Sequence, residues 1–169
     1  MMDRNILVAV QAAFGLEVPA GTEAMLLVEC DGSPAAAQAE IEEVYAICQR
    51  FGAIELMLAA NEAERKHLWT ARKKGVGAMG RLAPTVVTHD GVIPRSKLPE
   101  MLTFVYEVAE AERLGVANIF HAGDGNLHPC FYFDDREPGV VERVVRAGER
   151  ILTKCIELGG SVSGEHGIG

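Results

Sequence analysis

The apolar residues of this chain fall into short continuous runs separated by stripes with helical spacing. A run over 24–32 ends in an Asp-Gly turn and predicts a strand, and the run over 53–59 predicts a second strand. Between them, residues 33–52 begin with Ser-Pro and end with glycine, which are typical signals for the start and stop of a helix. The apolar residues of this segment lie on one helical face: Ile41, Val44, Tyr45, Ile47 and Cys48. Together these signals predict a β-α-β unit.

The rest of the pattern predicts three further helices and a group of strands. We expect the helices over 61–81, 97–115 and 137–160. We expect strands within 84–96, 116–122 and 127–134, and at the start of 161–169. Two of these strands are joined directly by a hairpin, and such strands must pair antiparallel. The chain is therefore expected to be an α+β protein. Its antiparallel sheet would contain ferredoxin-like β-α-β units and carry helices on one face.

The hairpin brings two histidines together. If GDGN (123–126) is the loop, His121 lies directly opposite His128 on the neighbouring strand. Side chains alternate along a strand, so both imidazoles share one face. The opposite face is then the hydrophobic core, with aromatic side chains at Phe120, Phe131 and Phe133.

Two neighbouring imidazoles can chelate a divalent cation such as Zn, Mn, Fe or Co. Glu165, in the segment GEHGIG, is the candidate third ligand because a carboxylate would balance the charge of the cation. The alternative is a plain hairpin, in which His121 and His128 only pack or hydrogen-bond. Glu165 and His166 would then be ordinary polar surface residues.

Composition and charge limit the classes of partner. The 169 residues suffice for one domain with a core, and 49% of them are hydrophobic. A net charge of −8 argues against nucleic acid and against an anionic membrane surface as partners. The apolar runs are too short to span a membrane, and the first residues lack the basic start of a signal peptide. We therefore expect a cytoplasmic location.

Several motifs occur in the order found in one protein family. HAGDGNLHP (121–129) is followed by GGSVSGEHGIG (159–169), and LWTARK (68–73) and DGVIPRSKLPE (90–100) precede both. In these segments the chain closely resembles the C-terminal substrate domain of the FAD-linked oxidases. That family includes glycolate oxidase, D-lactate dehydrogenase and D-2-hydroxyglutarate dehydrogenase. The resemblance covers almost the whole chain and is greatest to the flavin-binding subunit of glycolate oxidase.

The resemblance implies a set of roles for particular residues. It implies that His121, His128 and Glu165 are metal ligands. His166 would be the base that takes the hydroxyl proton of a 2-hydroxy acid, and the hydride at C2 would pass to FAD. Arg72 would bind the substrate carboxylate through its planar guanidinium. The resemblance also implies that a separate N-terminal domain holds the FAD and that other oxidase subunits are partners.

Two positions depart from the family members that take larger dicarboxylates. Those members resemble each other in having a lysine where this chain has Thr88, and an asparagine where it has Cys130. The resemblance therefore favours a small 2-hydroxy monocarboxylate such as glycolate or D-lactate as the substrate.

The domain organisation expected for residues 1–169 is a single, truncated substrate and metal domain without an FAD-binding domain. Family members continue past GEHGIG, so Glu165 and His166 lie near an end that is prone to fray. We expect the isolated chain to be inactive as an oxidase. The alternative function is a non-catalytic α+β fragment that only binds metal or forms a homodimer through surface left exposed.

Overall fold

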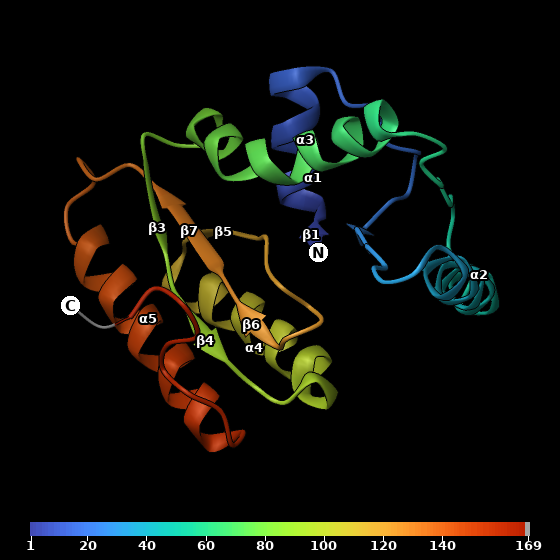
Figure 1. Ribbon diagram of the computed structural model, residues 1–169. Coiled ribbons are helices and arrows are strands. Elements are labelled where there is room, and N and C mark those ends of the chain that lie inside the picture. The colour runs from blue at the N-terminus through green and yellow to red at the C-terminus, as the bar shows by residue number, and fades with distance from the viewer. Residues whose placement is uncertain (168–169) are drawn as a thin grey trace.

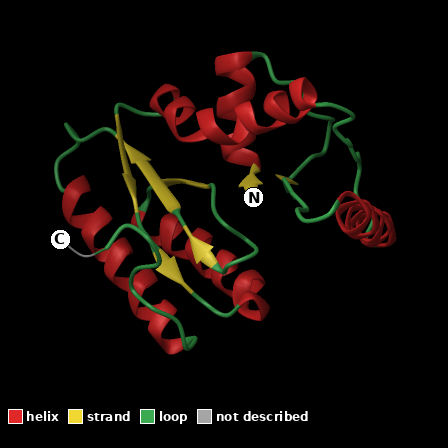
Figure 2. Cartoon of the chain, in the orientation of Figure 1, coloured by secondary structure: helices red, strands yellow, loops and turns green. Residues whose placement is uncertain are grey.

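The computed structural model describes residues 1–167, whose helices and strands are drawn in Figures 1 and 2. The four predicted helices are confirmed: α2 (Pro34–Arg50), α3 (Glu62–Ala78), α4 (Leu98–Glu112) and α5 (Val140–Glu157). A further helix, α1 (Arg4–Phe14), occupies an N-terminal segment for which the sequence pattern predicted no element. None of the described helices combines the length and apolar character needed to cross a lipid bilayer.

Side chains cap the starts of α2 and α3. The Ser33 hydroxyl accepts a hydrogen bond from the backbone N–H of Ala36 at 3.4 Å, directly before α2. The Asn61 side chain likewise accepts from the N–H of Glu64 at 3.0 Å, at the start of α3. These bonds satisfy donors that have no partner within the helix, which explains why the boundaries of α2 and α3 could be read from the sequence.

The strands pair antiparallel, as the hairpin required. The strands are β1 (Met2–Asp3), β2 (Ala24–Met25), β3 (Thr85–Thr88), β4 (Gly91–Val92), β5 (Gly115–Asn118), β6 (Asn126–Leu127) and β7 (Pro129–Phe133). The main sheet has the order β3-β7-β5, in which Cys130 of the central strand faces Thr88 on one side and Ala117 on the other. Two smaller sheets pair β4 with β6 and β1 with β2. Together with the helices they confirm the α+β fold class.

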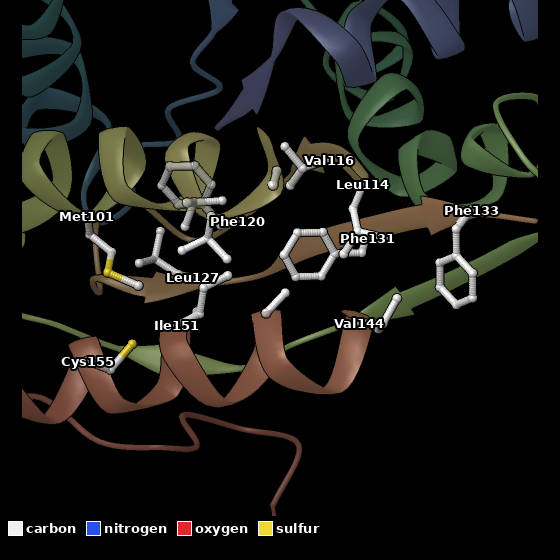
Figure 3. Close-up of a cluster of buried hydrophobic side chains, with 14 of the residues drawn as sticks. Met101, Leu114, Val116, Phe120, Leu127, Phe131, Phe133, Val144, Ile151 and Cys155 are labelled. Carbon is white, nitrogen blue, oxygen red and sulfur yellow. The ribbon is translucent and has the colours of Figure 1, made fainter. Parts of the chain in front are cut away.

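Helices cover both faces of the main sheet. One face carries the aromatic residues predicted for the core, and α4 and α5 pack on it (Figure 3) through the side chains of Phe120, Phe131 and Phe133. On the other face, Ile119 and Cys130 pack with α1 and α3 in a second buried cluster. The helices α4 and α5 thus form the expected layer, and α1 and α3 form another.

Asp3 fastens α1 to the rest of the molecule. One oxygen of its buried carboxylate accepts from the N–H of Ile6 at 3.0 Å and caps α1. The other accepts from the N–H of Asn118 at 2.7 Å and from the Tyr106 hydroxyl at 2.6 Å. One carboxylate therefore joins α1, β5 and α4, and burial with this hydrogen bond raises the pKa of Tyr106 above its usual range.

The predicted β-α-β unit is wrong in its strands. Only Ala24 and Met25 of the segment 24–32 lie in a strand, and 53–59 forms none. A strand is stabilised by a partner's backbone groups, and the free edge of β5 is instead met by the first residues of the chain. There the N–H of Phe120 donates to the carbonyl of Met1 at 3.0 Å. The helix α2 lies apart from the main sheet and buries none of its residues (Figure 1).

Candidate metal centre

The hairpin loop lies one residue earlier than the sequence suggested, so the partner of His121 changes by two positions. His121 pairs with Asn126, with N–H to carbonyl bonds of 3.0 and 3.3 Å, so the loop is AGDG (122–125). The prediction that His121 lies directly opposite His128 is therefore wrong. Gly125 explains the difference. It has a φ of +70°, and a Cβ there would lie 2.0 Å from the carbonyl oxygen of Ile93. A register change of two residues preserves alternation, so both histidines still share one face.

The structure brings the three predicted ligands together. One carboxylate oxygen of Glu165 lies 2.9 Å from Nε2 of His128 and 3.7 Å from Nε2 of His121. One possible ligand atom from each residue lies within 4.8 Å of the others. Ligand atoms held about 2.1 Å from one tetrahedral ion are about 3.4 Å apart. The observed spacing is therefore close to that of a metal site.

The buried imidazole of His128 has ring nitrogens that a bound cation would satisfy better than the surrounding protein groups do. Its side chain is 7% exposed, yet neither ring nitrogen has a hydrogen-bond partner among the described residues. The nearby Glu165 oxygen lacks the alignment that an N–H donor needs, although it is close. Buried polar atoms without a partner are costly, and coordination of a cation would satisfy Nε2.

The electrostatics favour the protonation state that binds metal. Burial lowers the pKa of His128, against the opposing influence of the carboxylates of Glu165 and Asp90. The ring is therefore held neutral, with a lone pair available to a metal. A hollow of about 300 Å³ adjoins these groups and is lined by Val92, His121, Asp124, Asn126, Gly164 and Glu165.

Arg72 and His166 also lie at this cluster. A guanidinium nitrogen of Arg72, on α3, lies 3.5 Å from Nε2 of His121. The His166 ring stacks on His128, with 5.0 Å between ring centroids and 14° between planes. Its Nε2 lies 3.6 Å from the Glu165 carboxylate. All five residues singled out in the sequence thus converge, although they come from α3, the hairpin and the segment after α5.

Asp90, for which the sequence indicated no role in the site, lies at its centre. Its buried carboxylate precedes β4, and one oxygen accepts four hydrogen bonds of 2.8–2.9 Å. The donors are the Ser163 hydroxyl and the backbone N–H groups of Gly164, Glu165 and His166. The other oxygen accepts from the Asn126 side chain at 2.8 Å. The only sequence signal for this role is a carboxylate directly before an apolar strand.

These contacts determine the ionisation of Asp90. Burial alone would raise the pKa of the carboxyl group. The hydrogen bonds from His166, Glu165, Asn126 and Ser163 outweigh burial, and the pKa lies well below its usual range. Asp90 is therefore a buried anion whose charge is met by oriented N–H and O–H groups.

Comparison with known proteins agrees with the fold and the motifs. The family model for FAD linked oxidases, C-terminal domain, matches residues 1–169. The glycolate oxidase subunit GlcD of Escherichia coli (strain K12) is 43% identical over 169 residues, which is 100% of this chain and 34% of that protein. GlcD of Bacillus subtilis (strain 168) is 34% identical over 168 residues, 99% of this chain and 36% of the relative. The D-lactate dehydrogenase of Anaerostipes hadrus is 33% identical over 153 residues, 88% and 32% of the two chains.

The chain thus spans about a third of the length of these curated relatives. The match to the family model extends over every residue of the sequence. The chain belongs to the FAD-linked oxidases, of which it represents the C-terminal domain.

Proposed function

We propose that this chain is the substrate- and metal-binding part of a flavin-dependent 2-hydroxy-acid dehydrogenase of the glycolate or D-lactate type. The observation that carries the proposal is the convergence of His121, His128 and Glu165, with the buried nitrogens of His128 lacking a hydrogen-bond partner within residues 1–167. A divalent cation held there would polarise the substrate hydroxyl group and lower its pKa. Two imidazoles and one carboxylate leave coordination positions open, as catalytic sites require.

Arg72 is the proposed ligand of the substrate carboxylate. Its guanidinium lies beside His121 and is only partly buried, so a carboxylate in the neighbouring hollow could reach it. A guanidinium can bind both oxygens of a carboxylate at once, which fixes the orientation of the substrate.

His166 is the proposed base. Its ring is exposed and stacks on His128, so Nε2 lies beside the proposed metal ligands rather than in the core. A neutral imidazole can take the hydroxyl proton near neutral pH. The hydrogen bond from the His166 backbone to Asp90 holds the residue in this position.

The described residues offer no cradle for the FAD pyrophosphate. The glycine-rich stretch GVGAMG (75–80) lies in α3 and the following 3-10 turn, not between a strand and a helix as a dinucleotide-binding loop requires. Gly75 is packed against Ile119, so its missing side chain serves helix packing. We therefore propose that FAD is held outside these residues, and we assign this chain only the substrate and metal.

A small monocarboxylate fits the two departures seen in the sequence. The Cys130 thiol is fully buried and lies 3.4 Å from the Thr88 hydroxyl. Neither residue presents a charge or an amide that could bind a second carboxylate. The named activities of the relatives, glycolate oxidase and D-lactate dehydrogenase, agree with a substrate of this size.

Metal analysis of the purified chain tests the proposal. We expect about one equivalent of divalent metal in the parent and its loss in His121→Ala and in His128→Ala. The exposed His67 of α3 offers a matched control, and His67→Ala should retain the metal. A parent chain that binds no metal would instead favour the alternative of a non-catalytic fragment.

Self-association, a cytoplasmic location and contact with other oxidase subunits stay predictions. The dimer prediction gains support from an exposed apolar segment, which we define as residues 26–58. Its side chains are 41–78% exposed at Leu26, Val28, Tyr45, Ile47, Phe51, Ile54, Met57 and Leu58. Large apolar side chains left exposed in this number can contact another chain, and we propose a second copy as the occupant.

A further inference from the structure

We propose that Asp90 is a positioning residue, whose carboxylate fixes the loop 163–166 so that Glu165 and His166 face the histidine pair. This inference rests on the metal site proposed above and concerns what holds that site together. The sequence pattern gave Asp90 no role in this site.

The loop is held mainly by a single oxygen atom. Three consecutive backbone N–H groups, those of Gly164, Glu165 and His166, point at Oδ2 of Asp90 from 2.8–2.9 Å. Consecutive N–H groups that converge in this way form an anion-binding concavity, and here the chain's own carboxylate fills it. Ser163 adds its hydroxyl at 2.9 Å and in turn accepts from the N–H of Gly167 at 2.8 Å.

The same carboxylate is also tied to the hairpin. Oδ1 of Asp90 accepts from the side chain of Asn126, the residue paired with His121. It also lies 3.8 Å from Nδ1 of His128. Imidazoles that bind metal commonly have a carboxylate near their second nitrogen, which fixes the direction of the ring. Asp90 therefore links the loop with Glu165 to the strands with both histidines.

Other contacts of the loop do not replace this link. The backbone of Ser161 exchanges two hydrogen bonds of 3.0 Å with Val92, which fixes the start of the segment. Beyond Ser161, Glu165 is half exposed, and the ion-pair contacts of its carboxylate within residues 1–167 are to the site histidines. The direction in which Glu165 and His166 point thus depends on their N–H bonds to Asp90.

Two substitutions separate the charge of Asp90 from its shape. In Asp90→Asn the amide oxygen can still face the three N–H groups. Its NH2 group then faces Nδ2 of Asn126, so the Asn126 amide must turn over to accept through Oδ1, which has no partner among the described residues. Asp90→Ala removes the acceptor altogether. The loop should be weakened in Asp90→Asn and released in Asp90→Ala.

Hydrogen exchange on the metal-free chain is the first readout. The amide hydrogens of 164–166 should be protected in the parent, exchange somewhat faster in Asp90→Asn and lose protection in Asp90→Ala, while α4 and α5 are unchanged. Asp3→Asn is the matched control, because Asp3 is an equally buried carboxylate with its own N–H donors. That variant should lower stability throughout the chain without selectively exposing 164–166.

Titration with Co²⁺ is the second readout, followed by the absorption of the bound ion. Affinity should fall about 10- to 100-fold in Asp90→Ala and less in Asp90→Asn. Unchanged protection of 164–166 in Asp90→Ala would overturn the proposal. If Asp90→Ala does not fold, parent-like exchange together with parent-like Co²⁺ affinity in Asp90→Asn would do so. A parent that binds no Co²⁺ refutes the metal site, and exchange alone then decides the role of Asp90.

Discussion

Gly164 is the point at which one added methyl group should disturb the candidate metal centre without touching a ligand. A Cβ at this position would lie 1.6 Å from Nδ2 of Asn126 and 2.7 Å from Cγ2 of Val92. Ordinary contact begins at 3.4 Å, so Gly164→Ala requires a movement of about 1.8 Å. Either the Asn126 side chain leaves Asp90, or the loop with Glu165 moves away from His128.

Both responses have a calculable cost. Loss of the bond from Asn126 to the charged Asp90 removes about 1.5–3 kcal/mol of interaction, and overpacking of this kind destabilises proteins by about 1–3 kcal/mol. We expect the free energy of unfolding of Gly164→Ala to fall within that range. Metal affinity should fall about 10- to 100-fold, because Glu165 or its support is displaced by far more than the few tenths of an ångström a metal site tolerates.

Urea denaturation and Co²⁺ titration of the purified chain measure the two effects. Gly123→Ala is the control, since Gly123 lies in the hairpin loop with open space around its Cβ and without a positive φ. It should change stability by less than about 0.5 kcal/mol. If Gly164→Ala binds Co²⁺ as tightly as Gly123→Ala does, the close packing of Gly164, Asn126 and Asp90 does not control the site.

Three further predictions concern other parts of the chain. His89 packs edge-on against Phe131, and burial lowers its pKa, so the folded chain favours the neutral ring. Its contribution to stability is complete above the unfolded pKa of about 6.5 and is lost as the pH falls through the lower folded pKa. In His89→Leu the free energy of unfolding should therefore depend less steeply on pH in this window. An unchanged slope would contradict the proposed contribution of His89. In the complete flavoprotein, Arg72→Lys should raise KM for glycolate or D-lactate at least about tenfold, from loss of two-point binding; unaltered steady-state kinetics would remove Arg72 from the site. Light scattering should show a concentration-dependent dimer that Phe51→Glu weakens, whereas a monomeric parent at every concentration would exclude self-association through the exposed apolar segment.

The parts of the fold that were predicted correctly depend on local chemistry. The side chains of Ser33 and Asn61 mark helix starts because they accept hydrogen bonds from backbone N–H groups three positions away. Side-chain alternation places Phe131 and His128 on opposite faces of the sheet, and a shift of the strand register by two residues does not change this. The strands predicted on either side of α2 are not formed, apart from Ala24 and Met25, for the opposite reason. Their apolar runs have strand character, but a strand also needs a partner, and no local signal states whether one is present.

The candidate site was likewise predicted only in part from local sequence signals. His121, His128 and Glu165 lie close together as expected, whereas the expected direct pairing of the two histidines is wrong. The register depends on the contact of Gly125 with Ile93, about thirty residues away in the chain. Asp90 was overlooked because its partners lie 36–76 positions further along. No spacing rule over a short window could connect them.

The unequal attachment of the three proposed ligands would affect how quickly a bound ion could leave. His121 and His128 belong to a hairpin held by strand pairing and a buried core, whereas Glu165 is half exposed on a loop fastened chiefly through Asp90. Opening of that loop requires far less free energy than unfolding of the sheet. The carboxylate would therefore detach first. A chelator could then remove the ion, and a new ion could enter, at the rate of loop opening while the rest of the chain stays folded.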